Sequence, residues 1–122
     1  MIIKLSNNNE YPVCSTGDYS TRVVPSGNAN VRSKMYVYMS VDVMPLEEFI
    51  ELFTNETNLE SITLKDESFE HVYENYTIAQ YVGKELVTEI NPNTGEALQE
   101  YKLVARLEQL TYIEQKLKAL GL

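Results

Sequence analysis

One stretch, from Lys34 to Met44, alternates strictly between apolar and polar side chains, and it limits the possible folds more than any other. Its apolar positions are Met35, Val37, Met39, Val41 and Val43. A repeat of two residues is the period of a β-strand with one buried face. We therefore expect a sheet whose methionine and valine face lines a core. On the other face, Tyr36 and Tyr38 form either ordinary cross-strand packing or a contact patch for a partner protein.

The segment from Tyr76 to Ile90 predicts another strand, because it is rich in β-branched and aromatic residues. Gly83 in its middle favours a bulge or bend at that point. A helix remains the alternative, since apolar residues also recur every four positions. The run from Asn91 to Gly95 then predicts a turn, because proline fixes φ and glycine accepts a positive φ.

The chain after this turn predicts a return strand, from Tyr101 to Glu108, followed by a short helix over residues 111–120. Thr111 and Glu114 have the spacing of a capping box, in which each side chain binds a backbone N–H of the other residue. Four apolar residues are spaced as the a/d seam of a helix pair, namely Leu110, Ile113, Leu117 and Leu120. They pack on the sheet of the same chain or on a partner, including a second copy. One continuous helix from about Glu100 is the alternative.

The remaining segments predict two hairpins, one helix and a loop. Residues 2–5 and 11–14 pair across three asparagines, and residues 59–65 pair with residues 69–73. Pro45 begins a helix over residues 45–54, with a buried stripe of Leu46, Phe49, Ile50 and Phe53. Residues 15–34 are polar and irregular and predict a long loop region. The expected fold is a single α+β domain over residues 1–122, mostly antiparallel sheet with one internal and one C-terminal helix.

No arrangement of residues predicts catalysis or a cofactor. There is no phosphate-binding loop and no zinc spacing, and the one cysteine, Cys14, lacks an activating base in the sequence. His71 is the only histidine, so no metal site is expected. The helix carboxylates Glu47, Glu48 and Glu51 lie on a stripe expected to face water, which does not favour acid–base work. We expect neither an enzyme nor a membrane protein, because no apolar run could span a bilayer.

The formal net charge of −8 is concentrated in the middle of the chain. Residues 45–100 hold thirteen acidic and two basic groups, whereas the segments on either side are slightly basic. An acidic surface of this kind repels nucleic acid and anionic membranes and attracts basic proteins. We therefore expect protein partners and no direct contact with nucleic acid.

Five segments together resemble a family of small proteins encoded in phages and prophages of Gram-positive gut bacteria. They are Met1–Leu5 with Glu10–Val13, Leu46-Glu-Glu-Phe with Phe53, Ser61-Ile-Thr-Leu64, Val72–Ile78 and Leu107–Leu117. The resemblance covers about two thirds of the chain and departs from the family between Ser15 and Val31. It implies an accessory protein of the phage particle or tail module, located in the bacterial host cytoplasm or the virion. It supplies no catalytic residues.

Two functions follow as hypotheses. The first is a structural or interaction protein of a phage tail or baseplate, acting through Tyr36, Tyr38 and the apolar residues of the C-terminal helix, which also offers a route to a homo-oligomer. The alternative is a small acidic inhibitor of a host defence nuclease. It would bind a basic groove through carboxylates such as Glu47, Glu48 and Glu51, and its binding would weaken with salt.

Overall fold

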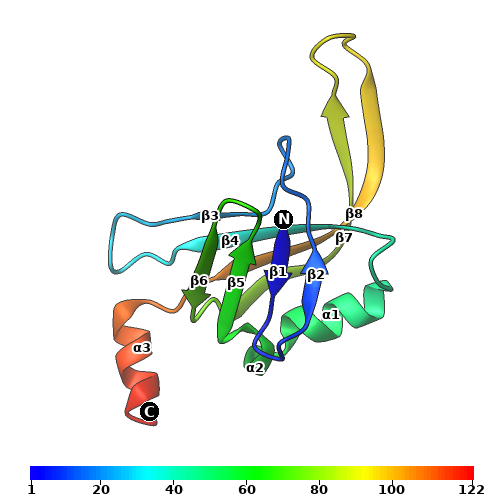
Figure 1. Ribbon diagram of the computed structural model, residues 1–122. Coiled ribbons are helices and arrows are strands. Elements are labelled where there is room, and N and C mark those ends of the chain that lie inside the picture. Colours follow the sequence, from blue (N-terminus) through cyan, green and yellow to red (C-terminus); the bar gives the residue numbers. More distant parts are fainter.

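The computed structural model describes residues 1–122 and has an α+β fold with two four-stranded antiparallel sheets (Figure 1). The small sheet has the strand order β2-β1-β5-β6, and the long sheet has the order β3-β4-β8-β7. The strands are β1 Ile2–Lys4, β2 Glu10–Pro12, β3 Arg22–Val24, β4 Lys34–Ser40, β5 Ser61–Lys65, β6 Glu70–Glu74, β7 Ile78–Ile90 and β8 Ala97–Glu108. The helices are α1 Leu46–Thr54, α2 Glu56–Leu59 and α3 Tyr112–Ala119. The predicted fold class is therefore confirmed.

Both hairpins of the small sheet follow the predicted pairing. β1 pairs with β2 across the asparagine turn, where Asn8 takes a φ of 69°. Asparagine accepts this left-handed conformation more readily than most residues. Pro12 lies in the edge strand β2, where the absence of an N–H costs no ladder bond. In the turn between β5 and β6, the Asp66 carboxylate accepts hydrogen bonds from the backbone N–H groups of Ser68 and Phe69.

β4 lies at the centre of the long sheet, and its alternation is the one expected from the sequence. Met35, Val37 and Met39 are completely buried. The strand ends at Ser40 and not at Met44, because the backbone N–H of Val43 turns back to the Ser40 carbonyl at 3.1 Å. Val41 lies after this end and is 40% exposed. The apolar alternation in the sequence therefore extends a few residues further than the strand.

β7 is a strand, which excludes the helical alternative for residues 78–90. Its bulge lies between Ala79 and Tyr81 and not at Gly83, so the first form of the prediction, a bulge at the glycine, is wrong. Gly83 serves a different purpose, because the Tyr81 ring lies across it. A Cβ atom at position 83 would stand 2.6 Å from the Tyr81 hydroxyl oxygen. The glycine thus provides the space that lets the tyrosine lie flat on the sheet.

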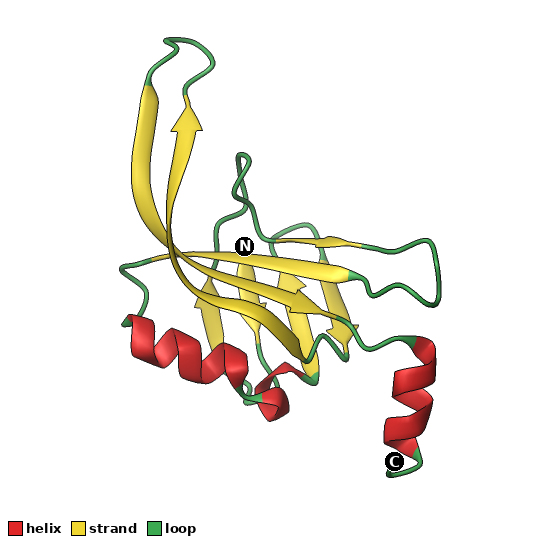
Figure 2. Ribbon diagram, turned by 180° about the vertical axis from the view of Figure 1, so that it is seen from behind, coloured by secondary structure: helices red, strands yellow, loops and turns green.

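A single buried cluster of 16 residues joins the two sheets and the first two helices. The strands of the two sheets cross one another in Figure 1, and α1 runs beside the long sheet in Figure 2. α1 buries Phe49 and Phe53 completely, whereas Ile50 is 38% exposed and is not part of the buried stripe. Pro45 is the N-cap residue of α1 and not its first helical residue. The chain then forms α2, capped by the Asn55 side chain, where the sequence suggested only a helix end.

The polar region 15–34 is less irregular than expected. β3 lies in its middle and pairs with the start of β4. Before β3, the chain lies along the open edge of β4, where the Cys14 N–H donates to the Tyr38 carbonyl at 2.8 Å. The Thr21 hydroxyl accepts from the Tyr38 N–H at 3.0 Å, and Thr21 is buried. Backbone groups of β4 that β3 does not reach are therefore paired by this segment.

The outer part of the β7–β8 hairpin, residues 86–101, extends beyond the two sheets, and we call it the arm (Figures 1 and 2). Its ladder runs from Leu86 opposite Tyr101 to Ile90 opposite Ala97. Gly95 has a φ of 72° in the predicted turn. α3 stands at the opposite end of the molecule from the arm (Figure 1). The fold therefore has a compact centre with one projecting element at each end.

Candidate interaction surfaces

The first candidate surface is α3, whose start is held firmly to the rest of the chain. The capping box is present, with the Glu114 N–H donating to the Thr111 hydroxyl and the Thr111 N–H donating to the Glu114 carboxylate. Arg32, from the loop before β4, donates to both oxygens of Glu114 at 3.2 and 2.8 Å. The hydrogen bond from Arg32, followed by that from Thr111, lowers the pKa of Glu114 to about 2. The orientation of the helix is thus set by charged hydrogen bonds at its first turn.

The apolar stripe of α3 points away from the rest of the protein. Lys118, near the end of the helix, approaches carboxylates of Glu56 and Glu60 at 3.4 and 3.8 Å. Glu114 and Lys118 are four residues apart and therefore share the face that meets the body of the protein. The stripe lies on the far side, with Ile113 60%, Leu117 43% and Leu120 73% exposed. No residue of α3 is buried, so packing of this helix on its own sheet, the first of the two expectations, is wrong.

Leu110 does not belong to this stripe. It lies in the link between β8 and α3, where its N–H donates to the Asn75 carbonyl at 2.9 Å. Its own carbonyl accepts from the Gln115 side chain at 2.8 Å. The predicted seam of four residues is therefore a stripe of three. Leu110 is not part of it, because α3 begins only at Tyr112.

The second candidate surface is the arm. Its exposed apolar residues are Leu86 (50%), Ile90 (66%), Leu98 (62%) and Tyr101 (53%). Two of them, Leu86 and Tyr101, continue the core-facing side of the long sheet past the last buried residue, so the sheet is longer than the layer that covers it. A two-stranded ribbon is marginal in water on its own, and contiguous exposed apolar residues mark binding surfaces. The arm therefore has the character of a contact element.

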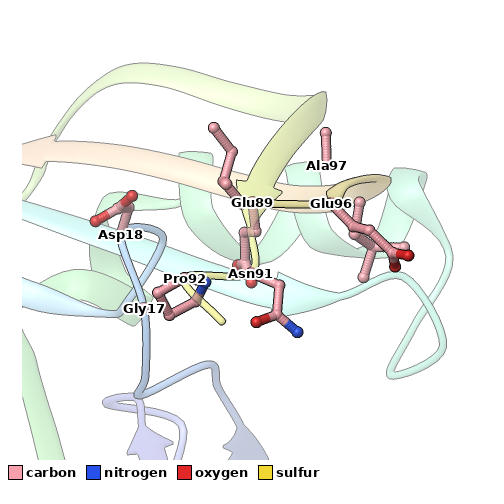
Figure 3. A pocket seen from close by; sticks show the side chains of 9 residues that line it. Gly17, Asp18, Glu89, Asn91, Pro92, Glu96 and Ala97 are labelled. Carbon is pink, nitrogen blue, oxygen red and sulfur yellow. The ribbon is translucent and has the colours of Figure 1, made fainter. Parts of the chain in front are cut away.

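An open groove of about 690 Å³ lies between the arm and the loop that follows Cys14 (Figure 3). We call it the arm groove, and its apolar residues are Ile90, Ala97 and Leu98. The carboxylates that line it are Asp18, Glu89 and Glu96. Gly17 lies beside the Glu89 carboxylate, and its φ of 79° is a left-handed conformation that glycine adopts without strain. The result is an open hollow lined by three apolar residues and three carboxylates.

The two predicted tyrosines differ in their surroundings. Tyr38 is buried, because Tyr19 packs edge-on against it with ring centroids 5.6 Å apart, so it is not available as a contact residue. Tyr36 is half-buried, and the Arg22 guanidinium lies 5.0 Å from its ring centre. Tyr36 lies directly opposite Arg106 in the pairing of β4 with β8. Arg106 in turn lies directly opposite Tyr81 in the pairing of β8 with β7.

The outward face of the long sheet thus carries an alternating row of Arg22, Tyr36, Arg106 and Tyr81. Arg106 lies 5.0 Å from the Tyr81 ring centre and donates to both Glu85 oxygens at 2.9 Å. Burial lowers the pKa of Arg106, but the hydrogen bonds and the charge of Glu85, together with smaller contributions from Tyr38 and Tyr81, raise it above its usual value. Both arginines of the row already make cation–π contacts with tyrosine rings, and Arg106 also pairs with the Glu85 carboxylate. We therefore interpret the row as a set of contacts that stabilise the sheet.

The carboxylates of α1 are placed as predicted. Glu47, Glu48 and Glu51 are exposed and form no ion pair. Glu47 and Glu48 lie in the first turn, where they complement the positive end of the helix. The predicted contact residues consequently sit on three separate elements, β4, α1 and α3, and do not form one surface.

The residues with chemically reactive side chains are already engaged in contacts within the chain. Lys102 is buried and contacts Glu100 at 2.7 Å and the Cys14 sulfur at 3.5 Å. Burial lowers the pKa of Lys102, and the contacts with Glu100 and Cys14 raise it by more. His71 lies against the Tyr73 ring with centroids 4.5 Å apart. No three His, Cys, Asp or Glu side chains gather in a way that could hold a metal ion.

Sequence reasoning missed the arm groove. The available signal was the pair of apolar residues, Ile90 and Leu98, beside a predicted turn, where polar residues are the rule. The groove also needs Gly17 and Asp18, which lie more than seventy positions earlier in the chain and which no local pattern connects with the arm.

Comparison of this chain with protein-family models, with curated proteins and with solved structures found no match. None of its three helices is both long and apolar enough to cross a membrane. The function proposed below accordingly rests on the surfaces of this chain and on the resemblance described above.

Proposed function

We propose that this chain is a non-enzymatic structural or interaction protein of a phage or prophage, associated with the tail or baseplate and acting through protein–protein contacts. The observation that carries the proposal is the placement of uncovered apolar side chains on two projecting elements. α3 has no buried residue, and the arm exposes Leu86, Ile90, Leu98 and Tyr101. Exposed apolar residues on rigid projections are typical of surfaces that become buried in an assembly.

The motif resemblance supplies the phage setting, and the anchoring of α3 supports a role in assembly. The hydrogen bonds from Arg32 to Glu114 hold the helix in one orientation before any partner is present. A presented helix loses less freedom on binding than a mobile tail does, which favours a specific contact.

Mass spectrometry of purified phage particles, induced from the source strain, tests this function. We expect the chain in the particles at an amount close to that of the tail proteins. A particle preparation that lacks it, together with expression early after induction, would contradict a structural role.

A second candidate function is inhibition of a host nuclease through a basic groove. The observation that favours it is the exposed, unpaired set of carboxylates on α1, Glu47, Glu48 and Glu51. Replacing all three with glutamine should weaken such a complex and reduce its dependence on salt. The matched control replaces Glu67, Glu70 and Glu74 with glutamine, because these three carboxylates are also exposed but lie in the β5–β6 turn and in β6. Equal effects of the two changes would indicate a nonspecific charge effect and not a binding face.

A further inference from the structure

We infer that the arm groove of one copy receives α3 of a second copy, so that the protein assembles head to tail. The two surfaces share a chemistry that suits a helix in a groove. The helix offers Ile113, Leu117 and Leu120. The groove offers Leu98 on the face of the ribbon that carries Glu89, together with Ile90 from the opposite face.

The charges of the two surfaces are opposite. Lys116 borders the apolar stripe of α3, one turn from Leu120 and next to Leu117, and it lies 5.3 Å from the Tyr112 ring centre. Lys116 forms no ion pair within its own chain, whereas Lys118 is held by Glu56. In the arm groove, Asp18, Glu89 and Glu96 likewise lack a cationic partner. An unpaired lysine beside an apolar stripe thus matches unpaired carboxylates in the arm groove.

Symmetric alternatives fit the charges less well. Pairing two arms through Leu98 would bring their Glu89 carboxylates together, because Glu89 lies directly opposite Leu98 on the same face of the ribbon, and like charges at close range are destabilising. Pairing two α3 helices would join only eight residues from each copy, with Lys116 beside the seam on both sides. A contact between unlike surfaces avoids both repulsions.

The contact has to be intermolecular, because the arm and α3 lie at opposite ends of one molecule (Figures 1 and 2). A contact between two different surfaces leaves one groove and one helix free at the ends of every dimer. Such an arrangement continues into a ring if the rotation between copies closes, and into a filament if it does not. The inference concerns the isolated protein, so its failure would leave the proposed function in phage particles unaffected.

The test uses two variants of the full chain, each altered only at exposed positions. The arm variant carries Ile90→Thr and Leu98→Thr, and the helix variant carries Leu117→Gln and Leu120→Gln. Circular dichroism and thermal melting establish that both keep the native fold. Sedimentation velocity then measures the mass of the wild type, of each variant and of an equimolar mixture, over a wide range of concentration.

We expect the wild-type mass to rise with concentration past that of a dimer, and each variant alone to stay at the monomer mass of 14.0 kDa. The mixture should form a one-to-one dimer and nothing larger, because only one intact groove and one intact helix are present. A wild type that stays monomeric would overturn the inference. Self-association of the arm variant alone would also overturn the inference, because it would indicate that two α3 helices pair. Self-association of the helix variant alone would overturn it as well, because it would indicate that two arms pair.

Charge reversal provides an independent readout. Lys116→Glu or Glu89→Lys alone should each weaken association by roughly threefold to tenfold, the range for an exposed pair turned into a repulsive one. Mixing Lys116→Glu protein with Glu89→Lys protein in equal amounts should restore long assemblies, because every junction joins opposite charges when the two proteins alternate. The double variant should recover association by itself for the same reason. Failure of the double variant to recover association would contradict the pairing of these two side chains.

Discussion

Replacing residues 88–99 with Asn-Gly removes the outer part of the arm and leaves every core residue in place. Glu89 is half-buried and the other eleven residues are exposed, and none belongs to the buried cluster. The ladder pairs that disappear run from Thr88 opposite Gln99 to Ile90 opposite Ala97. We expect a folded protein of nearly unchanged stability, because the removed side chains contribute nothing to the buried cluster.

The expected magnitude follows from two opposing terms. A two-stranded ribbon in water contributes close to nothing to the free energy of unfolding. Shortening a connection of twelve residues to two lowers the closure entropy by about 1.6 kcal/mol when the chain is treated as flexible. Val87 is the buried residue of the arm and stays in the shortened chain, and its partial exposure acts in the other direction by a similar amount. The free energy of unfolding should therefore change by less than about 1.5 kcal/mol.

Urea unfolding followed by circular dichroism measures this change, and the slope of the transition shows whether the exposed area on unfolding is preserved. Phe53→Ala is the matched control, since Phe53 is fully buried and its truncation should cost about 3–5 kcal/mol. If the shortened protein lost as much stability as the Phe53 variant, the arm would be part of the folding unit and the reasoning above would be wrong.

Three further predictions concern single contacts. Arg32→Ala should move the pKa of Glu114 from about 2 toward 4.5, as measured by NMR titration of its carboxyl carbon. Because the folded-state pKa is lowered, Glu114 stabilises α3 above about pH 4.5, and this contribution disappears as the pH falls toward 2. Thr111→Ala removes one side of the capping box and should cost α3 about 1 kcal/mol, seen as faster amide exchange in the helix, while β4 amides remain protected. Gly83→Ala should displace the Tyr81 ring from Arg106 with a loss of about 0.5–1 kcal/mol. An unchanged Tyr81 chemical shift would contradict this last prediction.

Short-range patterns in the sequence were sufficient to predict most of the elements. The alternation in β4 and the spacing of Thr111 and Glu114 depend on neighbours two or three residues away, and both appear in the structure. The turns at Asn8 and Gly95 follow in the same way from residues that accept a positive φ. Such features form wherever the local chain permits them, so they can be predicted without knowledge of the fold.

The tertiary structure alone decided which of these surfaces are covered. Tyr38 and Tyr36 share one face of β4, yet only Tyr38 is buried, because the segment from Cys14 to Thr21 passes over that part of the sheet. The stripe of α3 has the pattern of a buried helix face but remains exposed, because Arg32 and Glu56 hold the opposite side against the body. Burial depends on which distant segments arrive at a surface. The sequence of the surface itself does not contain that information, and for this reason the arm groove emerged only from the assembled fold.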